Sequence, residues 1–169
     1  EITGEKVLIL GAGGVARAVA ILAAEKKAAE LVILNRTREK GERIAEEVNG
    51  LAGRRLAEAR TLEEYRSLPD AKYLAIQATN VGMFPNVQTA VLEDRQFYRK
   101  IHTGYDLVFN PSRTRFMSLV EENGGKAFNG LKMLLYQGII AFELWTGISV
   151  GRELSEIAYE KMKRAMGIL

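Results

Sequence analysis

The sequence predicts an α/β protein with a doubly wound, mostly parallel sheet and helices on both faces. Short apolar runs of strand length alternate along the 169 residues with longer stretches of helical period. This alternation favours parallel strands joined by helical crossovers. Two further stretches at the C-terminus predict helices that lie outside the sheet.

The first half of the chain contains two strand-length apolar runs, each followed by a helical pattern. The second of these helices is expected to end at a glycine, a residue typical of helix C-termini. In order, the predicted elements are a strand at Lys6–Leu10, a turn at Gly11–Gly14, a helix at Val15–Glu25, a strand at Leu31–Leu34 and a helix at Glu39–Asn49 that Gly50 closes.

The second half continues the alternation with shorter elements. Pro111 has no backbone N–H and is expected to stop the strand before it, and Gly124–Gly125 is expected to end a helix. The predicted elements are a weak strand at Arg54–Leu56, a short helix at Leu62–Ser67, strands at Lys72–Gln77 and Tyr105–Phe109, a helix at Phe116–Asn123 and a last strand at Lys126–Phe128.

Residues 131–169 differ in kind from the rest of the chain. Leu131–Trp145 is apolar almost all the way round, and a helix with that pattern needs cover on two sides. The sheet is expected to cover one side, so another domain or subunit is expected to cover the other. Ser149–Met166 predicts an amphipathic helix. We therefore place a domain boundary near Gly130, between a sheet domain (1–130) and a helical extension (131–169).

The composition narrows the classes of function. The chain has 24 Lys and Arg, 21 Asp and Glu and a formal net charge of +3, scattered along amphipathic stretches. This pattern predicts a solvated surface and no nucleic-acid partner. The absence of cysteine excludes disulfides and thiolate metal sites, so we predict no metal and a reducing, cytoplasmic location. The apolar runs are too short to cross a bilayer, which predicts no membrane partner.

A glycine-rich turn, Gly11-Ala12-Gly13-Gly14-Val15-Ala16, matches a G-x-G-x-x-A fingerprint between a predicted strand and a predicted helix. The first glycine permits the tight turn, the second lets the backbone approach a pyrophosphate, and Ala16 lets helix and strand pack closely. Free amide donors at the positive end of the helix would face the phosphates. The fingerprint predicts a Rossmann-like, dinucleotide-binding domain; the alternative is a glycine turn that binds nothing.

The end of the second predicted strand distinguishes NADP from NAD. An NAD-binding domain places Asp or Glu there to accept hydrogen bonds from the ribose 2′-hydroxyl. Here Asn35-Arg36-Thr37 follows the strand, and the Arg36 guanidinium matches the geometry of phosphate oxygens. Lys40 would add a second positive charge, while Arg38 is a candidate for a solvated surface residue. We predict NADP as the cofactor; an exposed turn without a ligand is the alternative.

Three further motifs follow in order: Ala78-Thr79-Asn80-Val81-Gly82-Met83; Asp106-Leu107-Val108-Phe109-Asn110-Pro111 with Thr114; and Asn129-Gly130-Leu131-Lys132-Met133-Leu134-Leu135-Tyr136-Gln137, which runs on to Gly147. With the glycine turn and Asn35-Arg36-Thr37, they cover essentially the whole chain. In order and spacing the five motifs resemble those of the shikimate dehydrogenase family, including its N-A-T-S-x-G-M, D-x-x-Y-x-P-x-x-T and N-G-x-x-M-L-x-x-Q segments.

This resemblance implies reversible, NADP-linked reduction of 3-dehydroshikimate to shikimate in aromatic amino acid biosynthesis. It also implies a role for each matching residue. Asn35, Arg36, Thr37 and Lys40 would surround the adenosine 2′-phosphate, and Thr79, Asn80, Val81, Gly82 and Met83 would run beneath the cofactor. Leu107, Gly130 and Met133 would border the nicotinamide, while Phe109 and Gln137 would face the substrate. A buried amide at Gln137 would need polar partners, which a hydroxylated ring provides.

Departures from the family pattern limit what the resemblance implies. Phe109 stands where the family usually has Tyr, Gln77 replaces Asn, and Asn80 replaces Ser, so quinate or a related cyclic polyol is an open substrate. The family's catalytic Lys and Asp belong to an N-terminal domain that these 169 residues lack. We therefore predict no catalytic residue in this chain, NADP binding with little or no turnover, and a shikimate or 3-dehydroshikimate site only in the presence of that domain.

Other interpretations remain for the ionisable residues and for the chain as a whole. His102 is expected in a surface loop, Asp106 at the start of a strand, and Glu143 against a residue of the missing domain. The competing hypothesis is a stand-alone NADP-binding module, either regulatory or one subunit of a two-chain enzyme. Exposed apolar surface over 131–169 also predicts self-association.

Overall fold

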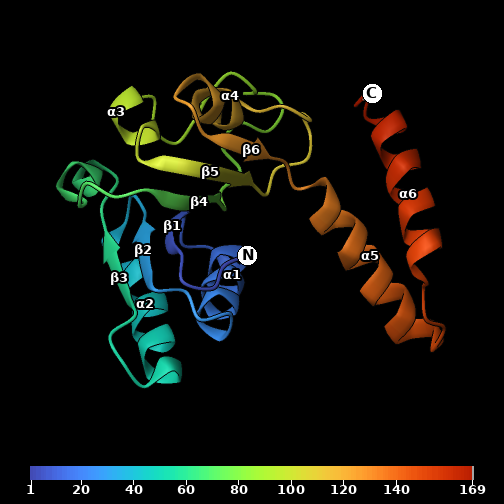
Figure 1. Cartoon of the computed structure of the whole chain (residues 1–169), viewed down its shortest axis with the longest axis horizontal. Coiled ribbons are helices and arrows are strands. Elements are labelled where there is room, and N and C mark those ends of the chain that lie inside the picture. Colours follow the sequence, from blue (N-terminus) through green and yellow to red (C-terminus); the bar gives the residue numbers. More distant parts are fainter. Residues whose placement is uncertain (169) are drawn as a thin grey trace.

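The computed structural model describes residues 1–168, in which six strands form a single parallel sheet (Figure 1). The strand order is β3-β2-β1-β4-β5-β6, and every neighbouring pair is parallel. The order grows outward in both directions from the β1–β4 pair, which makes that pair the topological switch point of a doubly wound sheet. The strands are β1 (Lys6–Leu10), β2 (Glu30–Leu34), β3 (Ala57–Arg60), β4 (Tyr73–Gln77), β5 (Ile101–Asp106) and β6 (Lys126–Phe128).

Helices cover both faces of this sheet. The crossovers from β1 to β3 put two helices on one face, and the crossovers from β4 to β6 put two on the other (Figure 1). The helices are α1 (Gly14–Glu25), α2 (Arg38–Ala52), α3 (Arg95–Tyr98), α4 (Arg115–Glu122), α5 (Leu131–Thr146) and α6 (Arg152–Ala165), with a 3₁₀ helix η1 (Glu63–Ser67) between β3 and β4. The doubly wound α/β class predicted from the sequence is confirmed.

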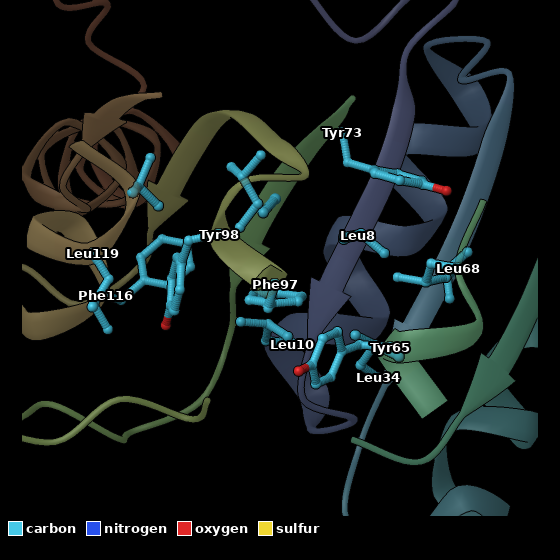
Figure 2. Packing of buried hydrophobic residues seen from close by; sticks show 14 of the residues in the cluster. Leu8, Leu10, Leu34, Tyr65, Leu68, Tyr73, Phe97, Tyr98, Phe116 and Leu119 are labelled. Carbon is cyan, nitrogen blue, oxygen red and sulfur yellow. The ribbon is translucent and has the colours of Figure 1, made fainter. Parts of the chain in front are cut away.

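Alternation along the strands divides the core into two layers. Val7 and Ile9 of β1 are buried against α1 and α2, whereas Leu8 and Leu10 face the opposite side. The second layer is rich in aromatic residues, and Figure 2 shows several of their rings lying along the sheet. The rings of Tyr65 and Phe97 meet edge to face at 5.5 Å, a favoured arrangement of aromatic pairs.

Two predicted strands lie elsewhere in the structure. Arg54–Leu56 is a connection and the strand is Ala57–Arg60, because α2 continues past Gly50 to Ala52 and ends at Gly53 in the left-handed conformation. The predicted strand Tyr105–Phe109 is also wrong: β5 spans Ile101–Asp106 and therefore includes the polar residues assigned to a loop.

Helix boundaries also differ at two places. The four-residue helix α3 was not predicted; Asp94 caps it by accepting a hydrogen bond from the Gln96 amide. The predicted helix at Leu62–Ser67 is a 3₁₀ turn over Glu63–Ser67. Both segments are too short to show a helical period in the sequence.

The two C-terminal helices pack on each other and lie to one side of the sheet (Figure 1). The inner face of α5 therefore meets α6, which corrects the expectation that the sheet would cover it. The outer face stays open, with Ile140, Leu144 and Trp145 at 56%, 78% and 86% exposure. Among residues 1–168, none of the helices has the length and apolar character needed to cross a membrane.

Asn49 holds the corrected connection between α2 and β3. Its side-chain oxygen accepts the amides of Leu56 and Ala57, both at 2.7 Å, and its Nδ2 donates to the Ala57 carbonyl at 2.9 Å. The side chain thus satisfies three backbone groups at the edge of the sheet.

We predict that Asn49→Ala lowers the free energy of unfolding by about 2 kcal/mol, because it leaves partly buried backbone groups without partners. Urea denaturation followed by circular dichroism measures the change. Asn123→Ala, which removes a single hydrogen bond to the Leu119 carbonyl, is the matched control and should cost clearly less. Equal losses for the two variants would contradict this role of Asn49.

Candidate cofactor site

The carboxyl ends of the central strands bring the predicted binding segments to one edge of the sheet. Leu10 pairs in register with Leu34 on one side and with Gln77 on the other, and Gln77 pairs with Asp106. The segments that follow these four residues therefore emerge side by side. Ligands of doubly wound sheets bind at this edge, next to the switch point.

The glycine turn after β1 has the geometry that the fingerprint requires. Gly11 has φ +110°, and a Cβ there would lie 2.7 Å from the Thr79 methyl carbon, so no other residue fits. A Cβ at Gly13 or Gly14 would meet no atom within 4 Å, so the backbone at the start of α1 borders open space. Ala16 is buried against the sheet. The first turn of α1 contains no acidic residue and no side-chain cap, which leaves its amides available to an anion.

The segment after β2 presents positive charge without a partner. Arg36 and Lys40 are exposed, and in the described part of the chain neither makes a side-chain hydrogen bond or ion pair. Asn35 is half-buried and donates to the Thr37 carbonyl at 2.8 Å, which shapes the turn. Thr37 itself is exposed, directly before α2.

Arg38 behaves differently from its neighbour. Its guanidinium pairs with Glu42 at 2.8 Å and with Glu64 at 3.3 Å. Both carboxylates raise the pKa of Arg38 further, with the Glu42 hydrogen bond as the main cause. Arg38 thus forms surface ion pairs, which agrees with its interpretation as a solvated surface residue.

The loop after β4 runs along the same edge and contains the predicted residues Thr79 to Met83. Gly82 has φ +90°, and a Cβ there would lie 3.2 Å from the Thr89 carbonyl oxygen, so the loop folds tightly on itself. Met83 and Phe84 are exposed, the latter at 80%. A cavity of about 340 Å³ lies within this loop and is lined by Asn80, Val81, Gly82, Met83, Phe84, Pro85, Asn86 and Thr89.

A buried polar group lies where β4 and β5 end. Asp106 is fully buried at the end of β5, which corrects its predicted place at the start of a strand. Its carboxylate accepts hydrogen bonds from Gln77 Nε2 at 3.2 Å, the Val108 amide at 2.9 Å and Thr114 Oγ1 at 2.6 Å. Burial raises the pKa of Asp106 to about 6, against the lowering effect of these three donors. We call this group the Gln77–Asp106–Thr114 cluster. All three residues belong to the motifs noted in the sequence, but the sequence did not predict that their side chains meet.

The residues predicted to border the nicotinamide are close together. The Gly130 amide donates to the Val108 carbonyl at 3.0 Å, and a Cβ at Gly130 would lie 2.2 Å from the Leu107 oxygen. Only glycine permits this approach of α5 to the end of β5. Met133 and Leu107 both line a cavity of about 600 Å³ on the α1 side of β4 and β5, together with Tyr105.

The two residues predicted to face the substrate have different surroundings. Phe109 is half-buried after β5, whereas Gln137 is exposed on α5 and has no hydrogen-bond partner in residues 1–168. The expectation of a buried amide at Gln137 is therefore wrong for residues 1–168, because α6 packs on another face of α5 and leaves Gln137 in solvent.

The other ionisable candidates have partners within the chain. His102 is a half-buried residue of β5, with Nε2 3.0 Å from Glu5 and Nδ1 2.9 Å from Thr103 Oγ1, and does not lie in a surface loop. Glu143 accepts the Val150 amide at 2.7 Å, which closes the turn between α5 and α6. The predicted pairing of Glu143 with another domain is replaced by this contact.

Comparisons with known proteins identify a family for this chain. The family model described as "Shikimate / quinate 5-dehydrogenase" matches residues 1–82, and the model for the C-terminal domain of shikimate 5′-dehydrogenase matches residues 130–154. The NADP(+) shikimate dehydrogenase of Carboxydothermus hydrogenoformans is 37% identical over 168 residues, which are 99% of this chain and 56% of the relative. The corresponding protein of Methanopyrus kandleri is 44% identical over 149 residues, with 85% and 50% covered.

Solved structures give the same result. The shikimate 5-dehydrogenase of Thermus thermophilus, crystallised with NADP(H) and shikimate, matches with a TM-score of 0.75 and 31% identity over 96% of this chain and 56% of that one. The chain thus spans about half the length of the curated relatives it matches. On its sequence motifs, its fold and these matches, the chain belongs to the shikimate dehydrogenase family.

Proposed function

We propose that this chain binds NADP at the carboxyl edge of β1, β2 and β4 and forms the cofactor half of a shikimate dehydrogenase. The observation that carries the proposal is an exposed, unpaired guanidinium at Arg36, on the strand next to a glycine turn whose amides border open space. Relatives named as NADP(+) enzymes support the choice of cofactor.

Each part of the site has a distinct task in this proposal. The amides of the Gly11–Ala16 turn bind the pyrophosphate, and Arg36 binds the adenosine 2′-phosphate with Lys40, Thr37 and Asn35 around it. The loop from Thr79 to Met83 runs beneath the dinucleotide. Leu107, Gly130 and Met133 border the nicotinamide, which supplies hydride chemistry when it is bound.

Turnover needs groups that these residues do not provide. Reduction of a ketone requires a proton donor beside the hydride acceptor, and the family resemblance assigns that task to a Lys and an Asp outside this chain. His102 and Glu143 are already hydrogen-bonded, to Glu5 and to the Val150 amide. In this proposal the chain alone binds NADP with little or no turnover, and residues 131–169 contribute to a substrate domain.

Two alternatives differ in substrate or in role. A quinate or shikimate dehydrogenase of broader range is supported by Phe109, which lacks the hydroxyl of the usual tyrosine, and by the family description, which names both ring acids. A stand-alone NADP-binding module is the other alternative. The cytoplasmic location stays a prediction.

Replacement of Arg36 by alanine tests the cofactor. We expect NADPH affinity to fall by about 1.5–3 kcal/mol, because a charge-assisted contact to phosphate is lost, while NADH affinity changes little. Isothermal calorimetry with each coenzyme measures both. Arg38→Ala is the matched control and should leave NADPH binding within about twofold, since Arg38 is paired with Glu42 and Glu64. Tighter binding of NADH than of NADPH by the unmodified chain would contradict the proposal.

Activity measurements test whether this chain binds the cofactor while another domain supplies the proton-transfer groups. Shikimate-dependent reduction of NADP by this chain alone should stay at background. Adding the separately expressed part of the Carboxydothermus relative that this chain does not span should restore measurable turnover, because it supplies the proton-transfer groups. Full activity of the chain alone would overturn the assignment; NADP binding without rescue would favour the stand-alone module.

Self-association through residues 131–169 is a separate expectation. The outer face of α5 exposes Leu144 and Trp145 at 78% and 86%, and apolar surface of this kind drives association. We expect the mass measured by light scattering to rise with protein concentration, and Trp145→Glu to weaken that rise. Leu51→Glu on α2, where the leucine is 65% exposed, should have no effect. A strict monomer at every concentration would refute this expectation.

A further inference from the structure

The Gln77–Asp106–Thr114 cluster extends into the two loops that border the proposed nicotinamide position. On one side, Gln77 Nε2 donates to the Val81 carbonyl at 3.0 Å, and Gln77 Oε1 accepts the Thr79 amide and hydroxyl, both at 2.6 Å. On the other side, Thr114 Oγ1 accepts the Met117 amide at 3.3 Å and so caps α4. One buried chain of hydrogen bonds therefore links the loop after β4 to the segment after β5.

The cluster also reaches the glycine turn and the start of α5. The Thr79 methyl carbon occupies the space that a side chain at Gly11 would need. Val108, whose amide donates to Asp106, accepts the Gly130 amide through its carbonyl. Contacts through Asp106 and its partners thus connect four segments of the site: the glycine turn, the loop after β4, the segment after β5 and the start of α5.

Burying the Asp106 carboxylate carries a desolvation penalty, so core packing alone does not explain why a carboxylate is present here. Asp106 has no cation as a partner: the groups that face it are Gln77 from β4, the Val108 amide, Thr114 at the start of α4 and Tyr98 of α3. An apolar residue in a core position avoids the desolvation penalty. A carboxylate with three neutral donors, however, fixes the direction of each donor and so the shape of both loops.

We propose that Gln77, Asp106 and Thr114 are positioning residues that hold the two loops in the arrangement needed to bind the nicotinamide half of the dinucleotide, while the adenosine half binds independently of them. This inference rests on the proposed binding of NADP. It separates the site into two parts: an adenosine part on the segment after β2, which has no contact with the cluster, and a nicotinamide part that depends on it.

The ionisation of Asp106 gives this arrangement a pH dependence. Burial raises the pKa of Asp106 to about 6, so the carboxylate is ionised in the folded protein above that pH and gains a proton below it. A protonated carboxyl carries a hydrogen, so either the hydrogen bond with the Thr114 hydroxyl reverses its direction or the contact with one of the two N–H donors is lost. The nicotinamide half therefore binds best above pH 6. Tyr98, the titratable group nearby, stays neutral in this range because burial raises its pKa.

Binding of two ligands to the unmodified chain and to its variants distinguishes the nicotinamide part of the site from the adenosine part. NADP contains both halves, whereas adenosine 2′,5′-bisphosphate contains the adenosine half with its 2′-phosphate. By calorimetry at pH 7.5, Thr114→Val should weaken NADP roughly tenfold, as expected for a buried acceptor that loses its donor, and should leave the bisphosphate within about twofold. Thr114→Ser keeps the hydroxyl and should restore NADP binding.

A pH series of the unmodified chain gives a second readout, with Asp106→Asn as its control. For this series the comparison ligand is adenosine 2′-monophosphate, and the ratio of NADP affinity to its affinity should fall between pH 7.5 and 5.5 in the unmodified chain and stay flat in Asp106→Asn. The 2′-phosphate, with a pKa of about 6, is then the one phosphate monoester in both ligands, so its titration cancels in the ratio.

The outcomes distinguish failure of the inference from failure of the proposed function. Equal weakening of the two ligands by Thr114→Val, loss of NADP that Thr114→Ser does not restore, or a flat ratio in the unmodified chain would overturn the inference. So would NADP binding no tighter than bisphosphate binding. If the unmodified chain binds neither ligand, the proposed function itself is wrong.

Discussion

The approach of two backbone segments at the switch point determines the rest of the site. The turn after β1 lies against the loop after β4, and no side chain fits between Gly11 and Thr79. Parallel pairing of β1 with β4 brings these segments together although the paired positions Leu10 and Gln77 are 67 positions apart in sequence. Every other element of the site, from the segment after β2 to the start of α5, is placed relative to this contact.

A similar constraint joins the sheet to the C-terminal helices. Gly130 lies so close to Leu107 that only a residue without a side chain allows α5 to begin there. This contact fixes the start of α5 beside the end of β5, whereas the far end of the helix extends away from the sheet (Figure 1). The arrangement leaves the outer face of α5 with large apolar side chains in solvent, a surface that isolated globular domains avoid.

The sequence predicted most reliably the elements whose pattern is local. Lys6–Leu10 and Lys126–Phe128 match the observed strands because each apolar or short run is bounded by turn residues. The strand β5 was misplaced because His102, Thr103 and Gly104 are polar or small, yet they lie inside the sheet. The missing side chain at Gly104 is compensated by Val120 and Phe116 of α4, a long-range contact that no local pattern reveals.

The binding residues show the same division. The glycine turn and Arg36 could be found from sequence because their chemistry depends on a few adjacent residues. The partners of Arg38, the burial of Asp106 and the exposure of Gln137 depend on segments far away in the chain. The sequence identifies the residues at these positions, but it does not predict which groups surround their side chains.

The two halves of the proposed site thus rely on different physics. The adenosine half uses free cations on an exposed segment, where attraction to a phosphate is long in range and tolerant of geometry. The nicotinamide half depends on buried neutral donors around a single carboxylate, where small displacements break hydrogen bonds. Hydride transfer is sensitive to the position of the nicotinamide and insensitive to that of the adenine. A hydrogen-bonded, buried cluster beneath one end and exposed surface charges at the other therefore match the precision that each end requires.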